Sequence, residues 1–374
     1  MPDLLPEWLS PWRFHWSFRR ARNHPGLEKA VYARMHANRI AQSARILGGS
    51  PKVWKHAARG FLNASSGRGN LRSLELAVTY RCNSRCAQCS CRLSHDAKKE
   101  KTRRLSEAEF KNAVDQAVDL GAFQFAINGG EPMLEEDLVF SLVEYIDKRH
   151  GRYVHLCTNG TLLTGEKVRK LAAAGLDSLE MGLDSAFEAV HDENRVPGSY
   201  AKIMEVVGWG RKHGVKVVLN TILTNEKVES ADMAATVALA KRLGCLLQIT
   251  PCCLTGAYKN RLDLMLTREA RLYFHWLLAK SANNRSDLYS SLTRIKCPAA
   301  REKIGLQPYG DVVSCPLIQI PYGNIREQSL EDIQTKMLEN PFYHLQKTQG
   351  CLPAMSEDFI RQYLMDPEAG PHGA

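Results

Sequence analysis

The sequence has no long apolar run: nothing in it approaches the roughly eighteen consecutive apolar residues that a membrane-spanning helix requires. It also lacks an N-terminal apolar segment followed by a small-residue cleavage site, so we do not expect secretion. The cytosol keeps thiols reduced, and a disulfide framework is therefore a poor explanation for the eleven cysteines of this 374-residue chain. Metal or cluster ligation, or catalysis, explains them better, and we expect a cytoplasmic protein.

Acidic residues are scarce in residues 1–70. This segment holds twelve Lys or Arg and three acids, so its net charge of +9 accounts for nearly all of the chain's +10. Arginines beside aromatic residues suit peripheral contact with an anionic membrane. Nucleic acid is a second interpretation, and a helical extension packed on the rest of the protein is a third. The aromatic residues are Trp8, Trp12, Phe14, Trp16 and Phe18.

From residue 71 short apolar runs alternate with amphipathic segments. Such runs are typical of parallel strands buried on both faces. Six strand–helix units in succession predict an α/β fold with a parallel sheet curled into a barrel or most of one; a doubly wound open sheet is the alternative. Either fold places functional side chains at the carboxyl ends of the strands. The expected strands are 74–79, 123–128, 153–158, 178–183, 215–223 and 245–250.

The strand–helix alternation stops after about residue 270, where a turn-rich region with widely spaced cysteines begins. The pattern therefore divides the chain into four parts. They are a basic helical extension (1–70), the barrel (71–268), a small cysteine-containing domain (269–352) and a C-terminal tail (353–374).

Three cysteines directly follow the first expected strand with the spacing C-x3-C-x2-C: Cys82, Cys86 and Cys89. One short loop can aim three thiolates at a common point, and three thiolates leave one corner of a cubane [4Fe–4S] cluster without a protein ligand. A structural zinc site needs four protein ligands, and Cys91 or His95 could complete it. The loop alone leaves both the cluster and zinc open.

In its context the loop resembles that of the radical S-adenosylmethionine (SAM) enzymes, whose C-x3-C-x2-C motif follows the first strand of a partial (β/α)6 TIM-like barrel. The resemblance implies an enzyme in which a reduced cluster cleaves SAM to methionine and a 5′-deoxyadenosyl radical, which abstracts a hydrogen from the substrate. It also implies an electron donor such as flavodoxin or ferredoxin. The stretches similar to the family are NGGEP (128–132), TNGTLL (158–163) and LDSAFEAVHDENRVPGSYAKIM (183–204).

The resemblance also assigns roles to individual residues. Arg195 would pair with the SAM carboxylate, Asp184 would be a catalytic residue facing the substrate cavity, and Asn220 would hydrogen-bond the SAM ribose. Two residues depart from the family's pattern: Gln88 stands where an aromatic residue is usual, and Gly182 where many relatives have serine. The full set expected to bind SAM is Gly129, Gly130, Glu131, Pro132, Asn159, Arg195 and Asn220.

A second set of cysteines resembles the auxiliary-cluster domains of the same family, called twitch in the short form and SPASM in the long form. Cys297 and Cys315 carry the resemblance, and Cys351 would be a third ligand. Ala354 stands where relatives have another cysteine, which favours the short form. The resemblance therefore implies a second [4Fe–4S] cluster with three cysteine ligands. Its fourth position would go to a non-cysteine residue, to substrate or to an exogenous ligand; unliganded buried thiols are the alternative.

Cys252 and Cys253 follow the sixth expected strand, at the end of the barrel where chemistry is expected. One of them could supply the missing cluster ligand or a hydrogen atom to a substrate radical. Core packing is the preferred interpretation of both.

These observations predict a radical SAM enzyme that acts on a lipid-like or other small-molecule biosynthetic intermediate. A ribosomally made peptide is the alternative, placed second because residues 1–70 show no strands for a winged-helix leader-binding module. A zinc or iron–sulfur nucleic-acid-binding protein is the alternative of another class. Nucleic acid is not expected as a partner, since the GGEP motif and Arg195 would have no role in that protein.

Overall fold

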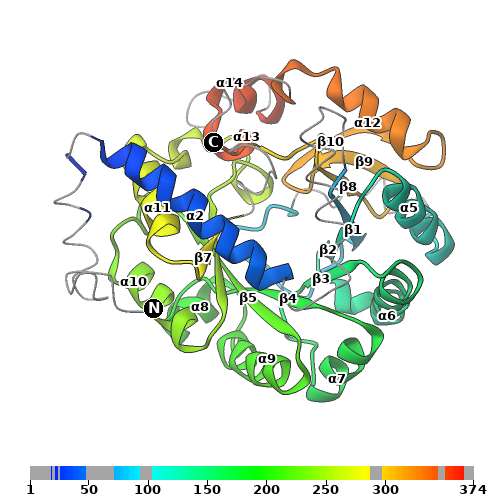
Figure 1. Ribbon diagram of the computed structural model, residues 1–374, viewed down its shortest axis with the longest axis horizontal. Coiled ribbons are helices and arrows are strands. Elements are labelled where there is room, and N and C mark those ends of the chain that lie inside the picture. Colours follow the sequence, from blue (N-terminus) through cyan, green and yellow to red (C-terminus); the bar gives the residue numbers. More distant parts are fainter. Residues whose placement is uncertain are drawn as a thin grey trace.

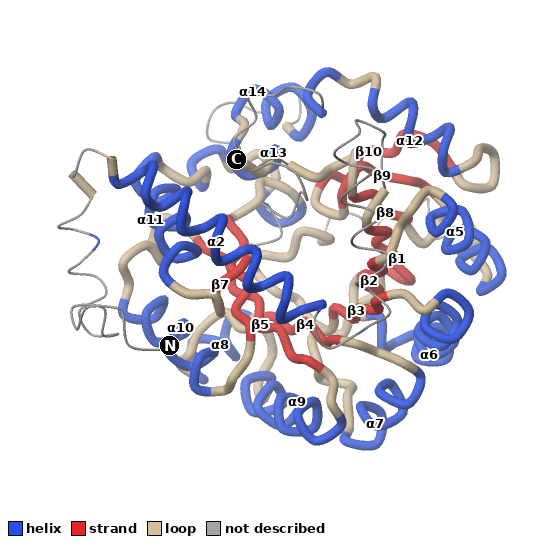
Figure 2. The backbone as a smooth tube through the Cα atoms, viewed as in Figure 1, coloured by secondary structure: helices blue, strands red, loops and turns tan. Residues whose placement is uncertain are grey.

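The computed structural model describes residues 18, 22–23, 26–47, 71–92, 103–286, 297–343 and 350–365. Its centre is a ten-stranded sheet with the order β10-β9-β8-β1-β2-β3-β4-β5-β6-β7, curled so that helices cover its outer face (Figure 1; Figure 2). The strands from β1 to β7 run parallel to their neighbours. The predicted α/β partial barrel is confirmed.

The six expected strands are all present, each within one residue of its predicted ends. They are β1 Ser73–Thr79, β2 Gln124–Gly129, β3 Tyr153–Cys157, β4 Ser178–Gly182, β5 Lys216–Leu223 and β6 Leu246–Pro251. Helices connect them, and the first begins at a capping box in which Ser106 and Glu109 bond each other's backbone N–H groups. The connecting helices are α5 Glu107–Asp119, α6 Glu136–Glu144, α7 Gly165–Ala174, α8 Glu188–Asn194, α9 Ser199–His213 and α10 Ala231–Arg242.

The two faces of the sheet differ in polarity, as β1 shows. Alternate residues such as Leu74 and Leu76 are fully buried in the core with side chains of the covering helices. The residue between them, Glu75, belongs to the other face, where it accepts from Asn128 at 3.0 Å and pairs with Lys303 at 3.0 Å. The expected burial of β1 on both faces is confirmed, because the polar groups of the second face are paired across strands and stay buried.

The C-terminal strands continue the same sheet. β8 (Lys303–Leu306) pairs in parallel with β1, and β9 (Asp311–Cys315) and β10 (Ile318–Asn324) follow in antiparallel order. At the opposite edge a short strand that the sequence did not predict, β7 (Asn284–Arg285), pairs with β6. The remaining helices are α11 Arg268–Lys280, α12 Leu330–Leu338, α13 Leu352–Met355 and α14 Glu357–Phe359.

The described part of the N-terminal segment packs on the barrel. Helix α2 (Leu27–Leu47) lies along α11, where Asn38 donates to the carbonyl of Leu278 at 2.9 Å (Figure 1). Phe18 is fully buried, with its ring centroid 5.1 Å from that of Tyr273. Phe18 therefore does not face a membrane, as the membrane interpretation would require; its ring is part of the core, as expected for an extension packed on the rest of the protein. The other aromatic residues of the membrane interpretation, Trp8, Trp12, Phe14 and Trp16, lie outside the described residues.

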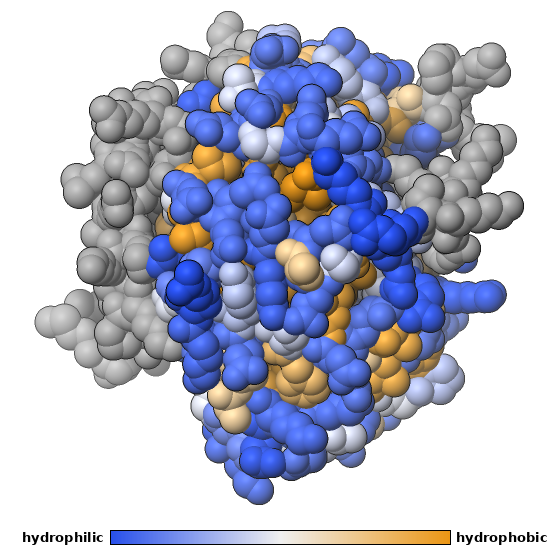
Figure 3. Space-filling model, turned by 90° about the vertical axis from the view of Figure 1, so that its right-hand side faces the viewer, coloured by the Kyte–Doolittle hydropathy of each residue, from blue (hydrophilic) through white to orange (hydrophobic). Residues whose placement is uncertain are grey.

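One face of the molecule is mostly polar. On the face that carries α5, α6 and α12, charged and polar side chains dominate and apolar ones form separate smaller areas (Figure 3). No helix in the described part of the chain is both long and apolar enough to cross a membrane.

Candidate cluster and SAM sites

The loop after β1 carries the first cysteine set at the carboxyl end of the barrel. Cys82 is exposed, whereas Cys86 and Cys89 are half-buried. The backbone N–H of Ser84 donates to the Cys82 sulfur at 3.4 Å. Burial raises the pKa of both Cys82 and Cys86, and the Arg195 guanidinium opposes the rise at Cys86. The site thus offers a hydrogen-bond donor and a cation to thiolates.

The three sulfurs of the first cysteine set are not gathered as closely as a single zinc ion would hold them. Among the described residues, His155, Cys157 and Glu180 are the group of three potential ligands whose ligand atoms all lie within 4.8 Å of one another. The sulfurs of the first cysteine set are therefore spread more widely. A zinc ion holds its sulfur ligands about 3.8 Å apart, because each lies about 2.3 Å from the metal in a tetrahedron. A cubane cluster places several atoms between its cysteines.

Cys91 differs from the three motif cysteines. Burial raises its pKa to about 11, so the thiol stays protonated at neutral pH. The side-chain amide of Gln319, on β10, donates to its sulfur at 3.8 Å. Cys91 thus contacts β10, where the cysteine loop meets the C-terminal strands. His95, the other candidate for a zinc site, lies outside the described residues.

The GGEP loop is packed against the cysteine loop. A Cβ on Gly129 would lie 2.2 Å from the carbonyl oxygen of Thr79, and one on Gly130 would lie 2.2 Å from that of Arg81. Gly129 also has a φ of +145°, which favours glycine. The N–H groups of Gly130 and Glu131 bond these same two carbonyls at 2.7 and 2.8 Å. The glycines therefore permit close approach of two protein backbones, and their contact with SAM stays a prediction.

Glu131 is fully buried, and its carboxylate joins its own loop after β2 to the loop after β3. It accepts from the hydroxyl of Thr158 at 2.6 Å and from the backbone N–H groups of Asn159 and Met133 at 2.7 and 3.0 Å. Burial raises the pKa of this carboxyl, and the three hydrogen bonds oppose the rise. Pro132 follows as the first residue of a short 3-10 helix. A ligand ammonium at Glu131 would share an acceptor that already has protein donors.

Asn159 ties the loop after β3 to the cysteine loop. Its amide donates to the side chains of Asn83 at 2.7 Å and Ser84 at 3.1 Å, and a further side-chain hydrogen bond to Cys82 lowers the pKa of that thiol. The predicted cofactor residue thus contacts the loop that carries the cysteines. This link is local evidence that the first three loops form one unit.

Arg195 and Asp184 form a bidentate ion pair next to the cysteine loop. Nε and Nη2 of Arg195 donate to the carboxylate at 2.8 and 2.9 Å, and Nη1 lies 4.0 Å from the Cys86 sulfur. Burial raises the pKa of Asp184, but the guanidinium outweighs it and lowers the pKa overall. Asp184 is only 3% exposed, so it faces Arg195 rather than an open cavity. Its catalytic role stays a prediction.

The ion pair explains why Gly182 departs from the family's pattern. A Cβ on Gly182 would lie 1.9 Å from Nη2 of Arg195. Glycine at this position makes room for the guanidinium in its present orientation. The other departure, Gln88, contributes a side-chain hydrogen bond to Asp184, so it supports the same pair.

His191 also belongs to this site, although the sequence did not single it out. The backbone N–H of Asp184 donates to His191 Nδ1 at 3.1 Å. Burial lowers the pKa of His191 to about 4, so the ring is neutral at physiological pH. A signal was present in the sequence, since His191 lies in the HD pair of the stretch that resembles the family.

Asn220 lies in a polar network on the inner face of the sheet. It donates to Glu180 at 2.7 Å, and Gln248 donates to the same carboxylate oxygen at 3.2 Å. His155 contacts the other carboxylate oxygen at 3.1 Å and the hydroxyl of Ser178 at 2.6 Å. These protein hydrogen bonds engage both ring nitrogens of His155. Sequence reasoning missed the network because its members lie in strands read as apolar.

The second cysteine set lies between the C-terminal strands and α13. The Cys297 sulfur accepts from the backbone N–H groups of Leu352 and Ala299, and the Cys315 sulfur accepts from that of Leu317. Burial raises the pKa of Cys315 to about 12 and that of Cys351 well above its ordinary value. Backbone donors aimed at buried sulfurs are the environment in which proteins hold iron–sulfur clusters. The donor set therefore fits the group.

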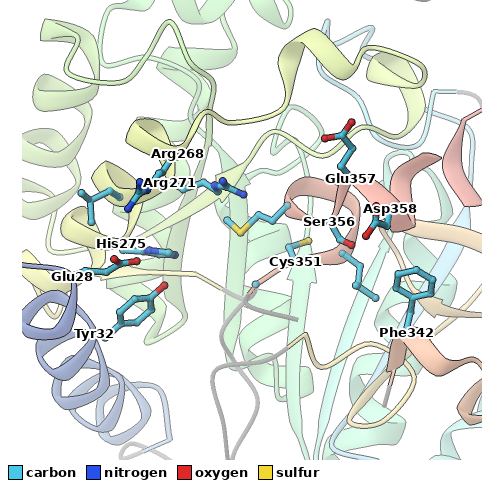
Figure 4. Close-up of a pocket in the computed structure, with 14 residues that line it drawn as sticks. Glu28, Tyr32, Arg268, Arg271, His275, Phe342, Cys351, Ser356, Glu357 and Asp358 are labelled. Carbon is cyan, nitrogen blue, oxygen red and sulfur yellow. The ribbon is translucent and has the colours of Figure 1, made fainter. Parts of the chain in front are cut away.

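A pocket of about 540 Å³ borders this second set (Figure 4). Cys351 lies between Arg268 and Arg271 of α11 on one side and Glu357 and Asp358 of α14 on the other. Helix α2 closes one end with Glu28 and Tyr32. The motif cysteines after β1 are not among its lining residues. The pocket thus gives access to the auxiliary site rather than to the SAM site.

Comparisons with known proteins agree with this geometry. Residues 76–240 match the Radical SAM superfamily, and residues 297–352 match an iron–sulfur cluster-binding domain, SPASM. The mycofactocin maturase MftC of Mycolicibacterium smegmatis is 29% identical over 253 residues, which cover 64% of this chain and 62% of the maturase. The chain thus spans less than two thirds of that relative. The PqqA peptide cyclase of Rhizobium meliloti is 27% identical over 274 residues, or 68% of this chain and 71% of the cyclase.

A third relative and a solved structure extend the comparison. The AdoMet-dependent heme synthase of Methanosarcina barkeri is 25% identical over 285 residues, or 68% of this chain and 80% of the synthase. Streptococcus suis SuiB bound to the precursor peptide SuiA has a TM-score of 0.58 at 17% identity, with 78% of this chain and 69% of SuiB covered, which shows a shared fold. The two matched domains imply that the cofactors of this chain are S-adenosylmethionine and [4Fe–4S] clusters. The chain belongs to the radical SAM superfamily, as an enzyme with a C-terminal SPASM-type iron–sulfur domain.

Proposed function

We propose that this radical SAM enzyme modifies a ribosomally made peptide. The observation that carries the proposal is similarity over about two thirds of the chain to two enzymes named for mycofactocin maturation and for cyclisation of the PqqA peptide. The sequence alone favours a lipid-like or other small-molecule substrate and gives a peptide as the alternative. The buried Phe18 removes one of the aromatic residues on which a membrane-facing surface depended.

In this proposal Cys82, Cys86 and Cys89 hold the cluster at which SAM binds. Cluster and cofactor together supply hydrogen-abstracting radical chemistry once an electron donor such as flavodoxin or ferredoxin has provided an electron. Arg195 receives the SAM carboxylate through Nη1, which is directed toward Cys86 while its other two nitrogens bind Asp184. Asp184 then acts as a positioning residue for Arg195.

Glu131 and Asn159 have supporting roles in the same proposal. Their hydrogen bonds link the loops after β1, β2 and β3, which come from three separate strand–helix units. A site built from three loops needs such links to keep its ligands in place when SAM enters. Asn220 would meet the ribose only after releasing part of its bond to Glu180.

The charges that line the pocket beside Cys351 suit a short segment of a peptide. Its volume of about 540 Å³ lies in the range of small-ligand sites. Arginines on α11 and carboxylates on α14 face it from opposite sides, so a segment that carries both charges would find partners on each. We assign the pocket to part of the peptide.

The test uses anaerobically reconstituted full-length protein with dithionite and SAM. Short open reading frames next to the gene supply candidate peptides, and mass spectrometry follows both 5′-deoxyadenosine and peptide mass. A peptide deuterated at the modified position should transfer deuterium into 5′-deoxyadenosine. A Cys86→Ala variant should neither form 5′-deoxyadenosine nor change the mass of the peptide.

The proposal is wrong if every candidate peptide is inert while an organic extract or a porphyrin precursor stimulates 5′-deoxyadenosine formation. The substrate would then be a small molecule. The heme synthase relative makes this arm necessary.

A further inference from the structure

Four thiols gather beside the C-terminal strands, although the sequence motif accounts for three. Cys297, Cys315 and Cys351 influence one another electrostatically, and the thiols of Cys351 and Cys253 are hydrogen-bonded to each other. Cys253 also lies close enough to Cys297 to affect its ionisation. The fourth thiol comes from the loop after β6, far from the others in the chain.

Backbone contacts hold Cys253 in this position. The N–H of Leu254 donates to the carbonyl of Pro353 in α13 at 2.9 Å, which fastens the loop after β6 beside the second cysteine set. Further along the same loop, the N–H of Ala257 donates to the carbonyl of Cys89 at 2.9 Å. On the preceding side, the N–H of Cys252 donates to the carbonyl of Leu223 at 2.9 Å. The Cys253 sulfur therefore sits on a segment that is anchored on both sides rather than at a free loop tip.

We infer that Cys253 is the fourth protein ligand of the auxiliary [4Fe–4S] cluster, together with Cys297, Cys315 and Cys351. Each iron of a cubane cluster takes one ligand from outside the cluster, so four converging cysteines complete the site. On ligation the S–H bond of Cys253 breaks, an S–Fe bond forms, and the proton passes to solvent. Lys303 lies beside Cys297 and Cys315, where its positive charge offsets part of the thiolate charge.

The neighbouring cysteine shows what packing alone looks like. Cys252 is fully buried in an apolar cluster with Leu254, Ile318 and Phe359, and burial raises its pKa to about 12. Cys253 is only partly buried; its thiol is hydrogen-bonded to that of Cys351 and also donates to the carbonyl of Pro251 at 3.4 Å. The pair therefore provides a matched comparison: adjacent residues of the same type, of which one packs and the other ligates.

Ligation by Cys253 limits what the auxiliary cluster can do. With four cysteine ligands no iron is open to substrate, so the cluster takes up or delivers electrons without binding the substrate directly. The inference rests on the auxiliary cluster and not on the peptide, and its readouts are iron content and spectra. A failure here is therefore distinguishable from a failure of the proposed substrate.

The experiment isolates the auxiliary cluster in full-length protein with Cys82, Cys86 and Cys89 all changed to Ala. Into this background go Cys253→Ala and, as the matched control, Cys252→Ala. Each protein is reconstituted anaerobically and assayed for iron, acid-labile sulfide and the EPR spectrum before and after one equivalent of ferricyanide. The background and the Cys252→Ala control should keep about four irons and four sulfides per chain.

Cys253→Ala should lose one iron on oxidation and give the EPR signal of a three-iron cluster, or fail to retain a cluster at all. Added imidazole should change the reduced EPR spectrum of Cys253→Ala and leave that of the background unchanged. The inference is overturned if Cys253→Ala behaves as the background does, or if the background itself already loses one iron and responds to imidazole.

Discussion

The Arg195–Asp184 pair gives a quantitative prediction. The two side chains are 15% and 4% exposed, and removing one partner of such a buried pair costs about 3–5 kcal/mol, because the other charge stays buried. Asp184→Ala should lower the free energy of unfolding by that amount. Asp184→Asn should cost about 2 kcal/mol, since the amide oxygen still accepts one hydrogen bond. The exposed Arg261–Asp263 pair is the control, and Asp263→Ala should cost under about 1 kcal/mol.

The same variants distinguish positioning from catalysis. If Asp184 orients Arg195, urea titration of the anaerobic holoprotein should show the losses above, and equilibrium binding should show weaker SAM affinity, by about tenfold for each 1.4 kcal/mol lost at the site. The KM for substrate should stay unchanged. The reasoning fails if Asp184→Asn has normal stability, normal SAM affinity and normal 5′-deoxyadenosine formation, yet makes no product; Asp184 would then act on the substrate.

Three further outcomes follow from single residues. Burial lowers the pKa of His191 to about 4 from an unfolded value near 6.5, so between these pH values the unfolded state binds more protons than the folded state. The free energy of unfolding should therefore fall by about 2 kcal/mol as the pH drops from about 7 to 5. Urea titrations of His191→Asn should not show this dependence. Gly256→Ala adds a Cβ 2.3 Å from the carbonyl oxygens of Cys89 and Ser90 at a φ of +58°, and should cost about 2–4 kcal/mol and reduce iron retention, whereas Gly208→Ala, with open space, should do neither. Cys91→Ser should leave the iron content intact; loss of iron would show that Cys91 is a ligand.

Much of the framework could be predicted from local sequence. Six short apolar runs were enough to locate the strands of the barrel, and the Ser106–Glu109 capping box marked the start of a helix. Position along the chain also placed the cysteine loop correctly at a carboxyl strand end, because parallel strands bring all such ends to one side. These features depend on neighbours in the chain.

The rest depends on contacts between distant segments. Glu75 is compatible with an inner strand because Lys303, from β8, pairs with it and Asn128, at the end of β2, donates to it. Glu131 matched a motif, but no local pattern tells that Thr158 and Asn159 occupy its carboxylate. Cys253 looked like a core residue for the same reason: its partner, Cys351, is brought beside it only when α13 packs on the loop after β6.

That loop couples the two cysteine sets. Its Leu254 N–H is bonded to α13 beside the auxiliary site, and its Ala257 N–H is bonded to Cys89 in the SAM site, each at 2.9 Å. Order imposed at one end of a short, doubly anchored segment lowers the entropic cost of ordering the other, and such coupling is reciprocal. A cluster held at either site should therefore slow iron loss from the other. Chelator-driven iron release should be faster for each site alone, in variants that lack the other set, than for the same site in the intact protein; equal rates would mean that the loop carries no coupling.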